Sequence, residues 1–190
     1  AVSVVSHGIG GPSMAIALEE LVQCGCHTLI RVGTSGGMKE TVLGGDLVVA
    51  SAAVRAEGTS REYLPSPYPA VADFTVTQAL YQAGLALSKA RDGCRCHVGV
   101  VHSKDSFYGE VAPSTMPVGD RLIADWLAYV KCGCLTSEME CAALFAAGLS
   151  RGVRCGGVLN VLWNAELSRR GIENPRSHDT ARGIQCALDG

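Results

Sequence analysis

One arginine follows an otherwise apolar run and is the first candidate for binding an anion. In the segment TLIRVGTSGG, Arg31 is followed by Gly33, Thr34 and Ser35. A buried guanidinium without a partner is costly, so Arg31 needs an anion, and its small neighbours leave room and hydrogen-bond donors for one. A bidentate contact with phosphate fits this pattern. The alternative is a structural ion pair with a carboxylate such as Asp46.

Two carboxylates flank a methionine in the segment SEMEC, just before an alanine-rich stretch. A carboxylate accepts hydrogen bonds from two hydroxyls at once, so Glu140 is a candidate for binding a sugar diol. The alternative is that Glu138 and Glu140 form a solvated pair at a helix start, where acidic side chains are favoured. The residues alone leave both interpretations open.

Two further segments have residue types that suit a ligand. The turn HGIGGPS, residues 7–13, is rich in glycine and precedes a predicted helix, and such turns can hold phosphate. It has Ser13 where a dinucleotide-binding turn has its third glycine, and the alternative is a tight turn that needs glycine dihedral angles. In SKDSFYGE, Phe107 can cover the face of a flat ring, or it can anchor the segment by packing.

Composition excludes several classes of function. The formal net charge is -2, without acidic or basic runs, which argues against a nucleic-acid partner. No apolar run reaches the roughly 18–20 residues that span a bilayer, and no signal peptide is seen. Six of the nine cysteines form C-x-C pairs, but zinc spacing and matching histidines are lacking. We therefore expect buried or half-buried thiols in a reducing cytoplasm rather than a metal or redox site.

Strand-like and helix-like patterns alternate along the 190 residues. This order predicts an α/β fold with a parallel or mixed sheet in one domain, residues 1–190, with ligands near the loops after 32, 101 and 162. The chain begins inside an apolar run without Met, so we expect an N-terminal segment to be missing. The expected strands are 2–6, 28–32, 46–54, 97–101 and 154–162; the helices are 12–23, 74–90 (capped by Asp73), 120–130, 140–150 and 177–188; 65–69 and 103–117 are loops.

Six segments together resemble the nucleoside phosphorylase superfamily and, within it, the uridine phosphorylase family. They are HGIGGPSMAIALEEL, RVGTSGGMKETVLGGDLVVASAAVRAEGTS, YPAVADF, SKDSFYG, EMECAALF and ENPRSHDT, in the family's order. The resemblance implies a three-layer α/β sandwich with a central mixed sheet flanked by helices, assembled as a homodimer or a hexamer of dimers. It also implies an enzyme that needs no cofactor and uses phosphate as a co-substrate.

The implied reaction is the phosphorolysis of uridine or a related pyrimidine nucleoside, in which phosphate attacks the anomeric carbon and the base leaves. The stretch VLNVLWN lacks the acid that purine-cleaving relatives carry there, which favours a pyrimidine. The resemblance implies catalytic roles for Arg31 and Glu140, phosphate binding by Arg31, Gly33 and Thr34, ribose binding by Met139, Glu140 and Thr34, base binding by Ser35, Gly36, Phe107 and Glu110, and a structural calcium or potassium at Ile9 and Ser13 of a subunit interface.

Two departures from the family affect base recognition. Glu110 stands where the family has a glutamine, and Thr115 stands where it has an arginine. An ionised glutamate only accepts hydrogen bonds, so it repels a uracil carbonyl, although a protonated one would imitate the amide. These changes motivate an alternative, a weakly active or non-catalytic nucleoside-binding subunit; a nucleoside hydrolase is a third hypothesis. The family's other phosphate ligands precede Ala1.

Overall fold

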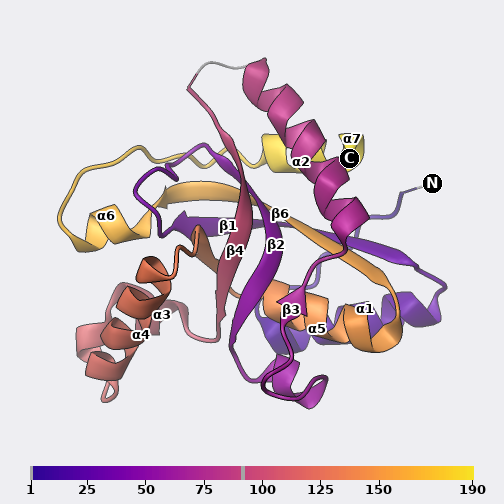
Figure 1. Ribbon diagram of the computed structural model, residues 1–190, viewed down its shortest axis with the longest axis horizontal. Coiled ribbons are helices and arrows are strands. Elements are labelled where there is room, and N and C mark those ends of the chain that lie inside the picture. Colours follow the sequence, from indigo (N-terminus) through magenta and orange to yellow (C-terminus); the bar gives the residue numbers. More distant parts are fainter. Residues whose placement is uncertain (1, 91–92) are drawn as a thin grey trace.

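The computed structural model describes residues 2–90 and 93–190, and its centre is a mixed six-stranded sheet (Figure 1). The strand order is β3-β2-β4-β5-β1-β6, with an additional pairing between β2 and β6. Pairs β1–β6, β2–β4 and β4–β5 are parallel, whereas β1–β5, β2–β3 and β2–β6 are antiparallel. The strands are β1 (Thr28–Gly37), β2 (Leu47–Ala56), β3 (Ala70–Val71), β4 (Cys96–Lys104), β5 (Thr136–Glu138) and β6 (Arg154–Asn164).

The second pairing of β2 closes the sheet into a barrel. Val158, Leu159 and Asn160 of β6 pair with β1 along one edge and with Leu47–Val49 of β2 along the other. Twisted sheets curl, and closure removes the exposed edges that an open sheet leaves unpaired. The mixed sheet with surrounding helices is therefore confirmed, but the open central layer of a three-layer sandwich is wrong.

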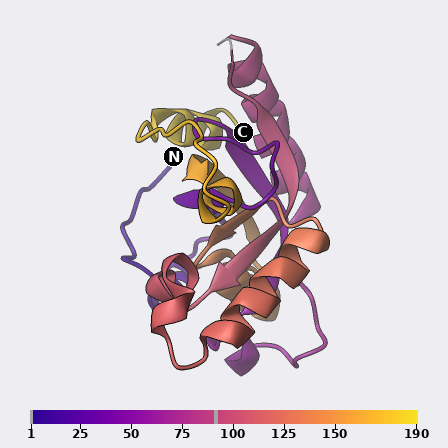
Figure 2. The ribbon, with the colours of Figure 1, turned by 90° about the vertical axis from the view of Figure 1, so that its left-hand side faces the viewer.

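Helices cover the barrel on several sides (Figures 1 and 2). Helix α5 packs between α1 and the sheet, α2 and α7 pack together against another side, and α4 lies beside α3 at a third. Within the described part of the chain, no helix has the length and hydrophobicity to cross a membrane. The helices are α1 (Gly11–Gln23), α2 (Phe74–Lys89), α3 (Phe107–Val111), α4 (Gly119–Lys131), α5 (Cys141–Arg151), α6 (Ala165–Arg169) and α7 (Ala181–Asp189), with short 3₁₀ turns η1 (Thr59–Glu62) and η2 (Pro113–Thr115).

The core explains why the strands read as continuous apolar runs. On β2, Val48 belongs to the cluster that packs with Leu18 and Phe145 of α1 and α5. Its neighbours Leu47 and Val49 belong to a second cluster, with Leu80 of α2 and Cys186 of α7. Both faces of the strand are therefore buried, and the polar alternation of a half-exposed strand is absent.

Most expected elements are confirmed, with shifted ends. Asp73 caps α2 as predicted, because its side chain accepts a hydrogen bond from the Val76 amide at 2.9 Å. Residues 2–6 form no strand; Val4 is 90% exposed, and a β-rich run becomes a strand only with a partner. The expected loop 103–117 contains α3 and η2, and the last helix begins at Ala181 rather than 177. The sequence patterns missed β3, β5 and α6, which have only two, three and five residues.

The nine cysteines are unpaired thiols, but two of them are exposed, contrary to the expectation. Cys24 and Cys132 are the C-cap residues of α1 and α4, and each precedes a glycine with positive φ. The amide of Cys26 then bonds back to the Leu21 carbonyl at 3.0 Å. This hydrogen-bond pattern is a Schellman turn, so the two C-G-C segments are helix ends in which the first thiol faces solvent.

Candidate active site

Arg31 lies in a cluster of buried charges on β1. It is 9% exposed, and its Nη1 is 3.4 Å from Glu138 Oε2, while its Nη2 donates to Glu140. Burial opposes the positive charge, but Glu138 and Glu140 outweigh it and raise the pKa of Arg31. The expected alternative partner, Asp46, instead accepts hydrogen bonds from the amides of Leu43 and Arg95 and contacts His97.

The guanidinium of Arg31 is not fully satisfied by these partners. Its Nε is buried and has no hydrogen-bond partner among the described residues. Gly33 makes room for this side chain, because a Cβ at that position would overlap the guanidinium. Residues i and i+2 share a face of a strand, so a larger residue at Gly33 would push Arg31 away from its carboxylates. The pairing and the free donor together make this cluster a candidate anion site.

Glu138 and Glu140, for which the sequence left two interpretations open, have different partners in the structure. Glu138 caps α5: its Oε2 accepts hydrogen bonds from the amides of Glu140 at 2.7 Å and Cys141 at 2.9 Å. Its Oε1 accepts from the Ser103 hydroxyl, and Ser103 Oγ accepts from the next free amide of the helix. Both carboxylates are buried, so the solvated pair is wrong, and only Glu138 acts as the cap.

The glycine-rich turn contacts the same cluster from the start of the chain. The Gly10 amide donates to Glu140 Oε1 at 2.6 Å, and Gly10 has a φ of 92°, a left-handed value that favours glycine. The turn also carries His7, whose Nδ1 is buried without a partner among the described residues. Burial and then the charge of Arg31 lower the pKa of His7, partly offset by Glu140. His7, Gly10, Arg31 and Glu140 therefore meet at one site.

The candidate residues that follow Arg31 were expected in a loop after residue 32, but they lie in strand β1, which continues to Gly37. Thr34 is exposed, and alternation places it on the face opposite Arg31, so the charged cluster does not include it. Ser35 is buried and donates weakly to the Asn160 carbonyl at 3.5 Å. A Cβ at Gly36 would lie 3.2 Å from that of Ala165, which shows how closely α6 approaches the strand.

Phe107 and Glu110 belong to the short helix α3. Phe107 is 42% exposed and packs edge-on against Tyr108, with ring centroids 5.5 Å apart. Glu110 turns inward: its Oε2 accepts from the Ser137 hydroxyl at 2.5 Å and lies 3.0 Å from Lys104 Nζ. Thr115, on η2, is exposed and donates to its own turn at the Ala112 carbonyl. Glu110 is therefore half-buried and forms an ion pair with Lys104.

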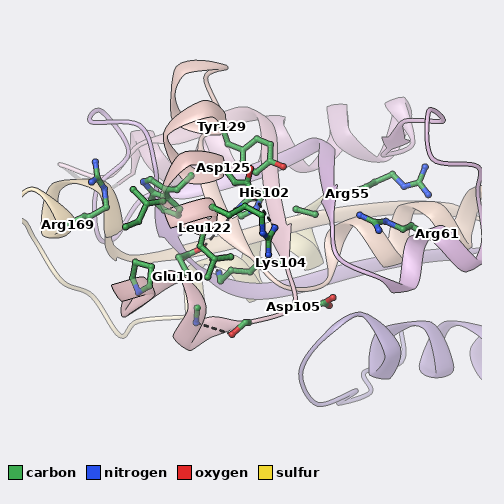
Figure 3. A pocket seen from close by; sticks show the side chains of 17 residues that line it. Arg55, Arg61, His102, Lys104, Asp105, Glu110, Leu122, Asp125, Tyr129 and Arg169 are labelled. Carbon is green, nitrogen blue, oxygen red and sulfur yellow. Dashed lines mark hydrogen bonds and ion pairs between the residues drawn. The ribbon is translucent and has the colours of Figure 1, made fainter. Parts of the chain in front are cut away.

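A cavity of about 450 Å³ opens beside this ion pair (Figure 3). His102, buried between Trp126 and Tyr129, forms one wall, and burial followed by the charge of Lys104 lowers its pKa to about 4. Its ring is therefore neutral near pH 7. The lining does not include Arg31, Phe107 or Glu140; among the residues that line the cavity are His102, Lys104, Gly109, Glu110, Trp126 and Tyr129.

Ile9 and Ser13 offer neutral oxygens for a cation. Ile9 is 77% exposed and Ser13 is half-buried on the first turn of α1. Among residues 2–90 and 93–190, no group of three or more His, Cys, Asp and Glu side chains is placed to hold a metal. Hard cations prefer several oxygen ligands, often carboxylates, so these two residues make a cation site only with ligands from elsewhere.

Sequence inspection named Arg31 and Glu140 but missed the partners that fix them. Glu138 was visible in the SEMEC segment, whereas Ser103 and Lys104 were expected in the loop 103–117, in the segment SKDSFYGE, without a role of their own. Register explains their importance: β4 and β5 are parallel, with His102 opposite Ser137 and Ser103 opposite Glu138. No local sequence signal reports that pairing.

Comparison with known proteins gives a consistent result. A family model described as the phosphorylase superfamily matches residues 1–180. The chain is 50% identical to a uridine phosphorylase of Treponema pallidum over 99% of its own length and 71% of that protein. It is 44% identical to a uridine phosphorylase of Thermococcus kodakarensis and 40% identical to one of Salmonella typhimurium, each over 86% of this chain. It spans 58% and 64% of those two relatives, respectively.

Proposed function

Since this chain belongs to the phosphorylase superfamily, we propose that it catalyses the reversible phosphorolysis of uridine to uracil and ribose 1-phosphate. The observation that carries the proposal is Arg31, a buried guanidinium with a free Nε beside the buried carboxylate of Glu140. Arg31 can donate hydrogen bonds to an anion, and Glu140 can accept hydrogen bonds from the hydroxyls of a sugar. Two such groups side by side suit a reaction that joins phosphate to a sugar. The names of the three relatives support uridine as the nucleoside.

The proposed chemistry rests on positioning and electrostatics. Phosphate, held by Arg31 beside Gly33, attacks the anomeric carbon as the bond to the base breaks. Positive charge develops on the ribose, and the carboxylate of Glu140, bound to its hydroxyls beside Met139, stabilises that charge. No covalent intermediate with the protein is needed, because the two substrates are brought together in one site.

The base is proposed to lie against Phe107, with Ser35, Gly36 and Glu110 around it. Phe107 is partly exposed, so its ring is accessible to a flat ligand. The Ser35 and Gly36 backbone lies in β1 next to β5, where Gly36 pairs with Ser137. Ser137 in turn donates to Glu110, which connects this part of the strand to the cavity beside α3.

The charge balance of the cluster implies a further cation. Arg31 supplies one positive charge, whereas Glu138 and Glu140 supply two negative ones. A phosphate would add to the excess of negative charge, so Arg31 alone is insufficient to hold it. We propose that the phosphate site is completed by cationic residues outside this set, from a neighbouring copy in a homodimer or a hexamer of dimers.

Uridine turnover with and without inorganic phosphate tests the function, with inosine as the comparison nucleoside. We expect phosphate-dependent release of uracil, formation of ribose 1-phosphate and a preference for uridine over inosine. Equal turnover without phosphate would indicate a hydrolase. Nucleoside binding without turnover would indicate the alternative, a weakly active or non-catalytic binding subunit.

The role of Arg31 has its own test in Arg31→Lys. This variant keeps a positive charge near both carboxylates but loses the fork of donors that matches phosphate. The phosphate KM should rise while the protein remains folded. An unchanged phosphate KM in an active variant would show that Arg31 is only a structural ion-pair partner.

A further inference from the structure

The ion pair between Lys104 and Glu110 is not explained by the phosphate and ribose roles. Lys104 is the last residue of β4 and is 8% exposed. Its Nζ donates to Ser137 Oγ at 2.8 Å and lies 3.0 Å from Glu110 Oε2. Both side chains line the cavity of about 450 Å³, and Figure 3 shows them together at its wall.

Each member of the pair keeps one hydrogen-bonding position free. An ammonium group has three N–H donors, and two of those of Lys104 are directed to Ser137 and Glu110. Both contacts of Glu110 fall on Oε2, so its Oε1 has no hydrogen-bond partner among the described residues. The pair therefore offers the cavity one donor and one acceptor, while its net charge is zero.

The neighbouring side chains occupy one oxygen of Glu110 and leave the other free. Ser137 Oγ accepts a hydrogen bond from the ammonium of Lys104 and donates one to Glu110 Oε2. His102 Nδ1 is 3.9 Å from the same Oε2, and its ring is neutral near pH 7 because burial and the charge of Lys104 lower its pKa to about 4. The Oε1 atom of Glu110 is therefore left as an acceptor.

The pair lies beside residues that are proposed to hold the base. Ser137, which contacts both Lys104 Nζ and Glu110 Oε2, pairs with Gly36 of β1. Glu110 belongs to the same short helix α3 as Phe107, the ring proposed to cover the base. Lys104 and Glu110 are therefore next to two of the elements that the proposed function assigns to the base.

We propose that Lys104 is a specificity-determining residue that reads a pyrimidine base together with Glu110. Its free N–H donates to a ring carbonyl, while Glu110 Oε1 accepts the neighbouring ring N–H. An imide edge offers that pattern of an N–H beside a carbonyl. This inference rests on the proposed function for the position of the base, and it assigns the base-reading donor to Lys104, a residue outside the set named there.

The test compares uridine with 3-methyluridine, which lacks the ring N–H, as substrates of the wild type, Lys104→Met, Glu110→Gln and the double variant. We expect the wild type to prefer uridine by about 10- to 100-fold in kcat/KM, the range for a lost hydrogen bond to a charged group. Lys104→Met should raise the uridine KM with little change in kcat, because base contacts contribute uniform binding.

The double variant separates recognition from folding. Its amide at position 110 supplies a donor and an acceptor without leaving a buried charge, so uridine KM should recover by about tenfold relative to Lys104→Met. Lys131→Met, at an exposed helix end, is the matched control and should leave both substrates unchanged. The inference is overturned if the ratio of kcat/KM for uridine to kcat/KM for 3-methyluridine is the same in all folded variants.

Failure of the proposed function gives a different result. If the wild type releases uracil at the same rate without phosphate, the phosphorylase proposal is wrong. The preference for uridine over 3-methyluridine can then still be measured from the rates of hydrolysis. A wild type that binds neither uridine nor uracil in calorimetry overturns both proposals. Stability of each variant is checked by thermal unfolding, so a loss of structure is not mistaken for a loss of recognition.

Discussion

Replacement of Arg31 by methionine is expected to destabilise the protein as well as stop catalysis. Methionine keeps much of the side-chain length but leaves Glu138 and Glu140 buried without their cation. Removing one partner of a buried ion pair typically costs about 3–5 kcal/mol, because an uncompensated charge remains. For a chain of this size, each 1 kcal/mol lowers Tm by roughly 2–4 °C, so we expect a decrease of roughly 10 °C.

The measurement is thermal and urea unfolding at pH 7, followed by circular dichroism. Arg151→Met is the matched control, since it removes an exposed ion pair with Glu19 at 2.8 Å and should change Tm little. The triple variant Arg31→Met/Glu138→Gln/Glu140→Gln removes the unpaired charges and should regain part of the lost stability. If Arg31→Met unfolds at the same temperature as Arg151→Met, the buried charges are compensated in another way and the reasoning fails.

Three further predictions concern single side chains. Glu140→Gln should lower uridine kcat/KM by ~2–4 kcal/mol in activation free energy, the scale of a lost preorganised electrostatic contact, and full activity would remove the ribose role. The pKa of His102 is lowered from 6.5 to about 4, so its contribution to stability is complete above pH 6.5 and is lost as pH falls towards 4. His102→Gln should reduce this loss by about 2 kcal/mol in urea unfolding at pH 7 and 4.5, whereas a variant of exposed His178 should not. Calcium or potassium should raise the Tm of the wild type more than that of Ser13→Ala, and equal shifts would remove the cation proposal.

Predictions from the sequence succeeded where the cause was local. Arg31 was identified because a guanidinium after an apolar run needs a partner, and the partner is a pair of buried carboxylates. Its assignment to phosphate stays a prediction. Asp73 was identified as a cap because the side chain and the amide that it accepts from are three residues apart. In each case the physical requirement lies within a few residues of the chain.

The same reasoning could not supply Glu138 as a partner of Arg31 or Lys104 as a partner of Glu110. Arg31 and Glu138 are brought together by the antiparallel pairing of β1 with β5, which sequence patterns did not detect. Glu110 reaches Lys104 because α3 folds back onto the end of β4, where the sequence suggested only a loop. Short elements have too few residues for a periodic pattern, so their positions depend on the surrounding packing.

The sequence by itself determined the alternation of strands and helices, the end of α1 at its C-G-C turn and the family of the protein. These follow from local propensity, periodicity and motif order. Only the tertiary structure decided that the sheet closes, because β2 and β6 pair across more than a hundred residues of chain. It also decided which charges are paired, since the energy of a buried ion depends on the atoms around it and not on its neighbours in sequence.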